Sequence, residues 1–465
     1  MAMGKRSREQ DEAMWVATTH LIDSPGHPFY QRLNDLMREQ GFDRYVEDLC
    51  QAYYAPKMGR PSIPPGVYFR CLMIGYFEGI DSERGIAWRC ADSLSLRRFL
   101  GIALDGQTPD HSSISRMRRL IDLETHAQVF SWVLKLLAEQ GLVRGKTISV
   151  DATTMEANAA MRSIVRRDTK ERYHEFLIRL AKESGIETPT RADLKKLDRK
   201  RPGKGSNDDW EHPGDPDAKI VKMKDGRTHL AHKVEHAVDL ETGVVVAATF
   251  QPAHAGDTTT FVETAQETIH RLEEVKADPA SADQLSETIL EELVLDAGAH
   301  SNRVLVELEE RGIRSYVSEP QRRRRKWKGK QREQSAVYAN RRRARSARGK
   351  RLGRKRRELV ERSFAHTLET GAMRRAHLRG HENICKRYLL HVAALDLGLL
   401  MRKLTGHGTP KGRQGLLAAA LATLLDMIQG ARGLLRTVVT QLVADRPAAT
   451  AHGRCFSSTT SATGC

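Results

Sequence analysis

Hydrophobic positions along the chain change their spacing near residue 145. Between residues 28 and 140, apolar residues recur every three or four positions, as in "FYQRLNDLMREQGF" and "PPGVYFRCLMIGYFEGI". This spacing predicts amphipathic helices. A longer stretch opens with the helix-start residues of "TPDHSS" and closes on Gly141. The first part of the chain is therefore predicted to be helical.

Beyond Gly145 the pattern is that of strands alternating with helices. "KTISVDATT" predicts one strand, and "THLAHKVEHAVDLETGVVVAATF" predicts two strands joined at "LETG". The helix "DTTTFVETAQETIHRLEEV", the strand "EELVLDAGAH", the helix "SNRVLVELEERG" and the strand "IRSYVSEP" follow. This order predicts an α/β fold with a mixed sheet flanked by helices.

Two inserts divide the chain. Residues 162–218 contain the predicted helix "DTKERYHEFLIRLAKESG" and then a polar stretch, "DLKKLDRKRPGKGSNDDWEHPGDPDAK", expected to be a loop or extended arm. Residues 321–356 separate the last strand from the helix "ELVERSFAHTLETG". We expect a helical domain at 1–140, an α/β domain at 141–410 with these two inserts, and a C-terminal helix with a disordered tail at 411–465.

The charge of the chain is concentrated in one segment. The formal net charge is +17, from 76 basic and 59 acidic residues. Residues 321–357 hold 19 basic residues and one acid, Glu333, so this segment is +18 and the remainder is −1. A polyanion partner is implied, with nucleic acid first among them. The alternatives are a solvated, disordered charge run or a targeting signal, although a signal needs only a handful of basic residues.

Arginines also gather in the helical part. Arg97 and Arg98 precede a turn, and Arg116, Arg118 and Arg119 follow it. Short helices with a tight turn and basic residues near the junction suggest a reader of DNA that resembles a helix-turn-helix. A helical bundle with basic residues facing water explains the same pattern, and these residues alone do not separate the two interpretations.

Two aspartates, Asp151 and Asp296, each end an apolar run and are followed by small residues. Strands that lie side by side would bring both carboxylates to one edge of the sheet, where α/β proteins bind ligands. Two close carboxylates cannot both ionise cheaply without a cation. Oxygen ligands suit Mg²⁺ or Mn²⁺, and two such ions can promote displacement at a phosphodiester. The alternative is that each aspartate only makes a turn.

Glu361 is the best candidate for a third acid. It lies in "RRELVERSFAH", on a predicted amphipathic helix directly after the basic segment. Arg357 precedes it by four residues, on the same helix face, where it would hold a phosphate beside the metal. Most helical glutamates face water, so the hypothesis depends on the two aspartates, Glu361, the sheet and the basic segment occurring in one chain.

These residues occur in stretches that match a known family. They include "GIDSERGIAWRCADSLSLRRFLG", "SVDATTMEANAAMRSIVRRD", "GDTTT", "LVLDAGAHSN" and "GRKRRELVERSFAHTLETG". Over about residues 25–412 the chain resembles bacterial insertion-sequence transposases of the DDE type, in the RNase H-like superfamily. Arg354 and Leu368 stand where many relatives have Tyr and Lys, and Ala299 stands where relatives tend to have an aromatic residue.

The resemblance implies an RNase H-like fold and two Mg²⁺ ions, replaceable by Mn²⁺, on a triad of Asp151, Asp296 and Glu361. It implies cleavage at the element ends and strand transfer into target DNA. The helical domain would read double-stranded terminal inverted repeats, and a homodimer would pair two ends. In the basic segment, Lys326 would contact phosphate. Trp327 and Tyr338 interrupt this segment, and they would either stack on an unpaired base at the cleaved end or, as we prefer, anchor a small subdomain.

Two other functions are compatible with the same sequence. One is a catalytically inactive, DNA-binding transposase remnant, and the other is an RNase H-like nuclease without strand transfer. The N-terminus has no apolar signal core, and the apolar run at 416–428 is shorter than the roughly 20 residues that span a bilayer. The cysteines form no CxxC pair. We therefore expect a cytoplasmic protein, with no membrane partner, that associates with the bacterial nucleoid when it is bound to DNA.

Overall fold

A computed structural model describes residues 26–55, 62–201, 205–223, 226–321 and 325–413. Contacts group the residues up to Pro410 into one compact unit, and Lys411 begins a second. The C-terminal helix and tail predicted at 411–465 lie almost wholly outside the described residues, as does the apolar run at 416–428. The first unit contains the predicted helical part, the sheet and both inserts.

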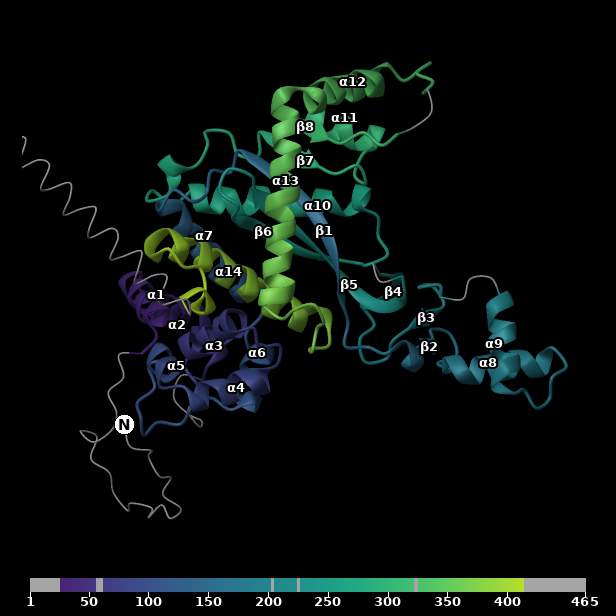
Figure 1. Cartoon of the computed structure of the whole chain (residues 1–465), viewed down its shortest axis with the longest axis horizontal. Coiled ribbons are helices and arrows are strands. Elements are labelled where there is room, and N and C mark those ends of the chain that lie inside the picture. The colour runs from purple at the N-terminus through teal and green to yellow at the C-terminus, as the bar shows by residue number, and fades with distance from the viewer. Residues whose placement is uncertain (1–25, 56–61, 202–204, 224–225, 322–324, 414–465) are drawn as a thin grey trace, which may run out of the picture. The chain divides into compact units, whose positions relative to one another are not determined.

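The N-terminal part is helical, as the spacing of apolar residues predicted (Figure 1). Asp110 caps the sixth helix and Asp122 the seventh, each by accepting a hydrogen bond from a backbone N–H of the first turn. The third helix is buried at nearly every position and forms the centre of this region. The helices are α1 (Pro28–Glu39), α2 (Phe42–Cys50), α3 (Pro65–Glu78), α4 (Glu83–Asp92), α5 (Leu94–Phe99), α6 (His111–Leu120) and α7 (Leu123–Glu139).

A mixed sheet follows, with the strand order β4-β5-β1-β7-β8, and β6 also pairs with β5. The predicted hairpin is β5 with β6, and both β5 and β6 run antiparallel to their neighbours. β1, β7 and β8 are parallel to one another. The strands are β1 (Thr147–Glu156), β4 (Lys219–Lys222), β5 (Thr228–Asp239), β6 (Val245–Gln251), β7 (Glu292–Leu295) and β8 (Arg314–Val317).

Helices from three parts of the chain cover the sheet. α10 (Asp257–Lys276) packs on β5, β6 and β1, and α13 (Ala347–Ala365) runs across β1, β5, β7 and β8 (Figure 1). α14 (His381–Thr405) packs against α3, α7 and β6. One hydrophobic core therefore runs without a break from the N-terminal helices to the sheet, so the change at residue 140 is a change of secondary structure within one core.

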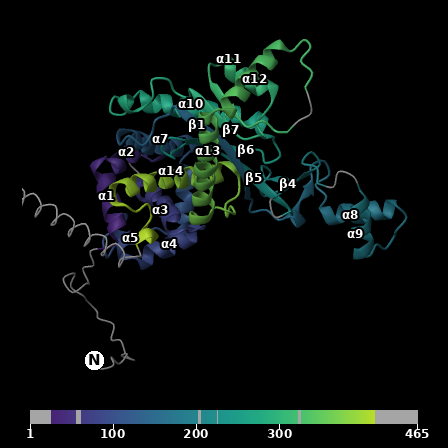
Figure 2. The same ribbon diagram turned by 45° about the horizontal axis from the view of Figure 1, so that its top comes forward.

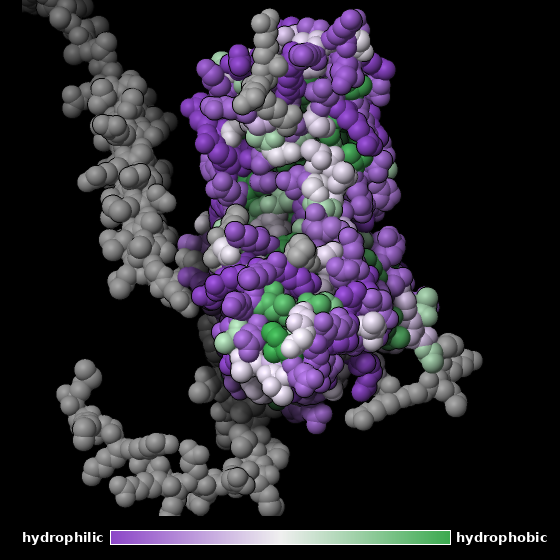
Figure 3. Space-filling view, turned by 90° about the vertical axis from the view of Figure 1, so that its right-hand side faces the viewer, coloured by the Kyte–Doolittle hydropathy of each residue, from purple (hydrophilic) through white to green (hydrophobic). Residues whose placement is uncertain are grey.

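The first insert forms a small subdomain with a core of its own. It contains α8 (Tyr173–Glu183), α9 (Arg191–Lys200) and the short pair β2 (Val165–Arg166) and β3 (Trp210–Glu211). α8 and α9 lie away from the sheet in two views (Figures 1 and 2), and this side of the molecule is mainly hydrophilic (Figure 3).

The expectation of a loop or arm was wrong for α9. Thr190 caps this helix in a capping box with Asp193, and Leu194 and Leu197 form its apolar face. Two leucines and one cap are enough to form α9, because its apolar face packs against a core that includes Trp210 and Phe176. Composition alone does not reveal that partner surface.

The basic segment is also mostly helical. It contains α12 (Gln331–Arg345), and α11 (Asn302–Glu310) precedes it. α13 also begins within this segment, at Ala347 rather than at the predicted Glu358. Several guanidinium groups bind the fold itself: Arg341 forms two hydrogen bonds of 2.7 Å with Glu319, and Arg343 donates to the Ser315 carbonyl at 3.0 Å. A disordered charge run is therefore the wrong description of this segment where the structure describes it.

Candidate active site

Asp151 and Asp296 lie level with each other on neighbouring parallel strands. The β1–β7 register pairs Ser149 with Val294, and continuing it by two positions sets Asp151 beside Asp296. Asp296 directly follows β7, as predicted. Asp151 lies in the middle of β1 rather than at its end, which corrects the expectation, because β5 continues to pair with β1 as far as Glu156.

One guanidinium joins these two carboxylates. Arg356 Nη2 lies 2.7 Å from Asp151 Oδ2 and 3.9 Å from Asp296 Oδ2. The Arg356 side chain is 12% exposed, compared with 27% for Asp151 and 43% for Asp296. The charges are therefore partly shielded from water, which strengthens their interaction.

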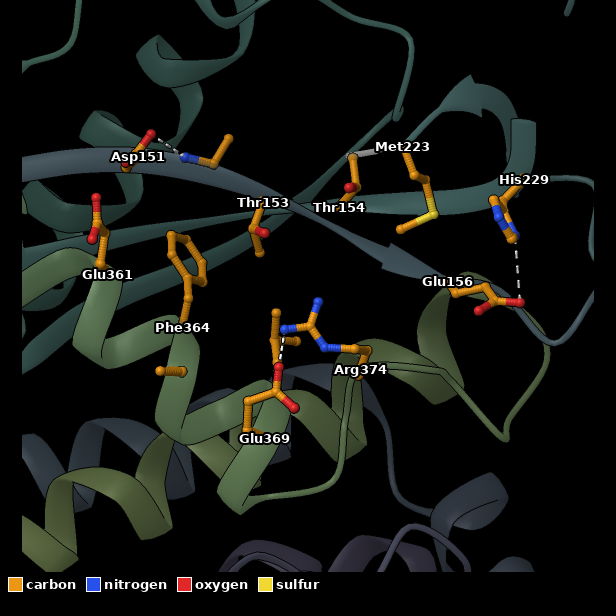
Figure 4. A pocket seen from close by; sticks show the side chains of 13 residues that line it. Asp151, Thr153, Thr154, Glu156, Met223, His229, Glu361, Phe364, Glu369 and Arg374 are labelled. Carbon is orange, nitrogen blue, oxygen red and sulfur yellow. Dashed lines mark hydrogen bonds and ion pairs between the residues drawn. The ribbon is translucent and has the colours of Figure 1, made fainter. Parts of the chain in front are cut away.

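Glu361 lies beside Asp151 in an open cavity of about 620 Å³ between β1 and α13. Figure 4 shows its carboxylate turned toward Asp151. Within the ranges that the structure describes, no group of three acidic, histidine or cysteine side chains is close enough to hold one metal ion. The three predicted acids are thus neighbours that do not meet at a single point.

Arg356, and not the predicted Arg357, contacts the two aspartates. Arg357 is exposed and lines a second cavity of about 590 Å³, formed with β7, β8 and Arg354. Arg356 follows Leu352 by four residues and precedes Val360 by four, and both are buried. A signal was present, because an arginine at i+4 spacing within an apolar stripe must face the sheet.

The Asp151 carboxyl is in an unfavourable place for negative charge. Burial raises its pKa above the usual range, and Asp296 and Asp257 raise it further. The Arg356 guanidinium and the Ala152 N–H lower the pKa of the same group without cancelling the effect of burial.

Asp257, in the stretch "GDTTT", is a further aspartate at the site that was not predicted from the sequence. A Cβ atom added to Gly298 would lie 3.0 Å from both Asp257 Oδ2 and Asp296 Oδ1. Both carboxylates therefore crowd this glycine. The Asp296 Oδ1 also accepts hydrogen bonds from Gly298 N at 2.8 Å and Ala299 N at 3.3 Å.

A buried lysine fixes Asp257. Lys233 Nζ lies 2.7 Å from Asp257 Oδ1, 3.2 Å from Glu235 Oε1 and 2.8 Å from Thr260 Oγ1. Two cations thus face four carboxylates, Arg356 with Asp151 and Asp296 and Lys233 with Asp257 and Glu235, and Glu361 lies beside Asp151. The remaining negative charge and the oxygen-only donors fit divalent cations such as Mg²⁺ or Mn²⁺.

The other predicted contact residues have different surroundings. Arg116 and Arg119 are exposed on α6. Arg118 is 6% exposed and forms an ion pair with Glu83, and its Nε donates to Asn383 Oδ1 at 3.2 Å. Arg118 therefore connects α6 to α4 and α14 in the interior, and its guanidinium is already engaged within the fold.

Lys326 is exposed, whereas Trp327 is half-buried and packs against the core. The Trp327 ring lies 6.1 Å from the Tyr338 ring, and the Arg325 guanidinium lies 5.7 Å from the Trp327 ring centroid. These contacts attach the chain before α12 to the rest of the unit. They favour the anchoring role for Trp327.

Comparison with known families identifies both parts of the chain. Residues 17–120 match the model of a transposase domain (DUF772), and residues 145–397 match the model of the transposase DDE domain. The chain belongs to the DDE transposase family. Its fold is RNase H-like, and the central sheet of this transposase has the order β4-β5-β1-β7-β8, with β6 paired with β5. No curated protein and no solved structure matches the chain.

None of the helices in the described ranges is long and apolar enough to cross a membrane. The cysteines among those residues, Cys50, Cys71, Cys90 and Cys385, are buried free thiols.

Proposed function

We propose that this transposase cuts DNA at the ends of an insertion sequence and joins the freed 3′-hydroxyl to target DNA, with Asp151, Asp296 and Glu361 as its carboxylate triad. The observation that supports this most directly is the Asp151–Arg356–Asp296 bridge. Two carboxylates on adjacent parallel strands share one cation there, beside Glu361 in an open cavity.

Mg²⁺, with Mn²⁺ as a substitute, fits the donors, and two ions would be held by Asp151, Asp296 and Glu361. When bound, such ions lower the pKa of the attacking water or hydroxyl and offset charge at the phosphorus. The chain supplies the rigid frame. The two N–H groups of Gly298 and Ala299 orient the Asp296 carboxylate, and the strand pairing sets Asp151 beside it.

The position of Glu361 depends on a buried hydrogen-bond chain. His236, opposite Asp151 on β5, bonds to Ser363 Oγ at 2.9 Å and to Tyr388 OH at 2.8 Å. Its ring stacks on Phe364 at 4.2 Å. These contacts fix the turn of α13 that carries Glu361, so the carboxylate can meet the substrate without reordering the helix.

DNA binding is assigned to exposed cations. Arg357 and Arg354 line the second cavity, Lys326 precedes α12, and Arg116 and Arg119 lie on α6. Their phosphate contacts would supply binding that weakens steeply with salt. Pairing of two element ends requires a homodimer in the DNA complex. The protein would act in the bacterial cytoplasm, on the nucleoid.

One observation favours a second candidate, a DNA-binding remnant without catalysis. The three acids do not meet at one point within the described residues, and an arginine already satisfies two of them. The two candidates differ in the reaction and share the DNA partner.

The test is Mg²⁺-dependent cleavage of DNA that carries the element's own ends. We expect cleavage by the native chain and its loss in Asp296→Ala, with DNA binding retained. Glu358→Ala is the matched control, because Glu358 is exposed and pairs with Arg362 on the same helix. Binding without cleavage by the native chain, in Mg²⁺ and in Mn²⁺, would support the remnant instead.

A further inference from the structure

Arg356 contacts both of the aspartates that would hold metal ions under the proposed function. Its guanidinium carries one positive charge and lies within 4 Å of both carboxylates. An ion that binds Asp151 Oδ2 would compete with Arg356 Nη2, which lies 2.7 Å from that oxygen and carries the same sign of charge. The arginine and the metal ion compete for the same oxygens.

Arg356 also has somewhere to move. Its side chain lines the second cavity, together with Lys350, Arg354 and Arg357, on the side of α13 that faces β7 and β8. Its Nε forms no hydrogen bond with any described residue and is buried. Gly353 lines the same cavity, and a Cβ added there would meet no atom within 4 Å. The guanidinium is thus incompletely bonded and lies beside open space rich in positive charge.

A DNA phosphodiester is the anion that fits this cavity. Guanidinium binds phosphate through two parallel hydrogen bonds, which a single carboxylate oxygen does not allow. The surrounding cations attract a polyanion strand, and the carboxylates repel it unless metal ions neutralise them. A phosphate in the cavity therefore offers Arg356 a partner that accepts two hydrogen bonds. Arg356 can then leave Asp151 and Asp296, the two carboxylates that metal ions would need as ligands.

We propose that Arg356 is a phosphate-binding residue of the reaction, and that it exchanges the Asp151–Asp296 pair for a DNA phosphate when metal ions bind. This proposal rests on the proposed function and assigns the exchange to the same site. DNA and metal ions then bind cooperatively. A DNA phosphate draws Arg356 away from the aspartates and so favours metal binding, and metal ions displace Arg356 toward the second cavity and so favour DNA binding. Linkage requires that DNA raise metal affinity by the factor by which metal raises DNA affinity.

The experiment measures Mn²⁺ binding to the full chain from the electron paramagnetic resonance signal of free Mn²⁺. Each titration is made without DNA and with a duplex that already ends at the cleaved 3′-hydroxyl, so that no hydrolysis follows. The same duplex without protein gives the Mn²⁺ that DNA itself binds. Asp151→Asn identifies the ions held by the carboxylate site.

Without DNA, Arg356→Gln is expected to bind Mn²⁺ more tightly than the native chain, by about 5- to 150-fold if the coupling is of ordinary size. The duplex should tighten Mn²⁺ binding to the native chain and leave that of Arg356→Gln nearly unchanged. Arg362→Gln is the matched control: it removes one charge from an exposed, ion-paired residue of the same helix and should behave like the native chain.

Unchanged or weaker Mn²⁺ binding by Arg356→Gln, with binding still abolished by Asp151→Asn, would overturn the exchange and leave the proposed function standing. Mn²⁺ binding that does not depend on Asp151 would overturn both. If Arg356→Gln does not fold, Arg356→Lys decides, because lysine keeps the charge and lacks the paired donors. Loss of the coupling by DNA in Arg356→Lys supports the proposal, and full coupling contradicts it.

Discussion

The buried histidine behind Glu361 makes the stability of this transposase depend on pH in a way that one substitution should reveal. His236 is fully buried between β5, α13 and α14, and burial lowers its pKa to about 3. In the unfolded chain an ordinary histidine has a pKa of about 6.5. Between these values the unfolded state carries a proton on His236 that the folded state does not.

The sign and size of the effect follow from this difference. The unfolded state binds more protons, so stability rises with pH across the window from about 3 to 6.5 and is lost as pH falls through it. Well below pH 6.5, one proton contributes a slope of about 1.4 kcal/mol per pH unit. Burial also lowers the pKa of His126 to about 3 and that of His391 well below its usual range, so their slopes add to that of His236.

His236→Gln tests the reasoning. At pH 7 the variant should lose about 1–3 kcal/mol, because Ser363 and Tyr388 keep at most part of their hydrogen bonding. Between pH 6 and 4 the free energy of unfolding, measured in urea, should fall for both chains as the pH is lowered. The slope of the variant should be smaller than that of the native chain by about 1.4 kcal/mol per pH unit. Equal slopes for the two chains would refute the assignment of a neutral, proton-excluding histidine at this position.

Three further substitutions have defined outcomes. Arg118→Met should lower the free energy of unfolding by about 3–5 kcal/mol, because Glu83 then keeps a buried charge without its partner, and thermal and urea unfolding would measure this loss. Gly298→Ala should fold normally and lose end cleavage, because its Cβ would displace the Asp296 carboxylate; cleavage at the native rate would contradict the crowding described above. Asp257→Asn should weaken Mn²⁺ binding in the paramagnetic resonance titration while circular dichroism stays unchanged, and unaltered binding would show that this carboxylate is too far from the ions to matter.

The sequence predicted elements well where periodicity and local signals agree. The helices of the first part, the β5–β6 hairpin and the position of Asp296 after β7 were all predicted from spacing, turns and apolar runs. The end of β1 was not predicted correctly. Its position depends on how far β5 pairs with β1, and β5 lies some 80 residues later in the chain. Long-range pairing of this kind leaves no local signal.

The same limit applies to charged residues. Arg118 and Arg116 are two residues apart on α6, and only the packing of α4 and α14 makes one of them interior. Arg356 and Arg357 are adjacent and both line the second cavity, but a helix turns by about 100° per residue, so only Arg356 reaches Asp151 and Asp296. The apolar neighbours Leu352 and Val360 could have identified Arg356, whereas nothing in the sequence near Asp257 indicates its approach to Gly298.

The continuous core has a consequence for dividing this transposase into fragments. α14 packs on α3 and α7 on one side and on β6 on the other, and Arg387 of α14 donates to the Ile80 carbonyl at 2.8 Å. A fragment that begins at residue 141 would expose the apolar side of α14 that α3 and α7 cover. Under the proposed function, the helices that read an element end and the carboxylates that cut it belong to one compact unit with one hydrophobic core. The spacing between the recognised sequence and the cut would then be set by this shared core.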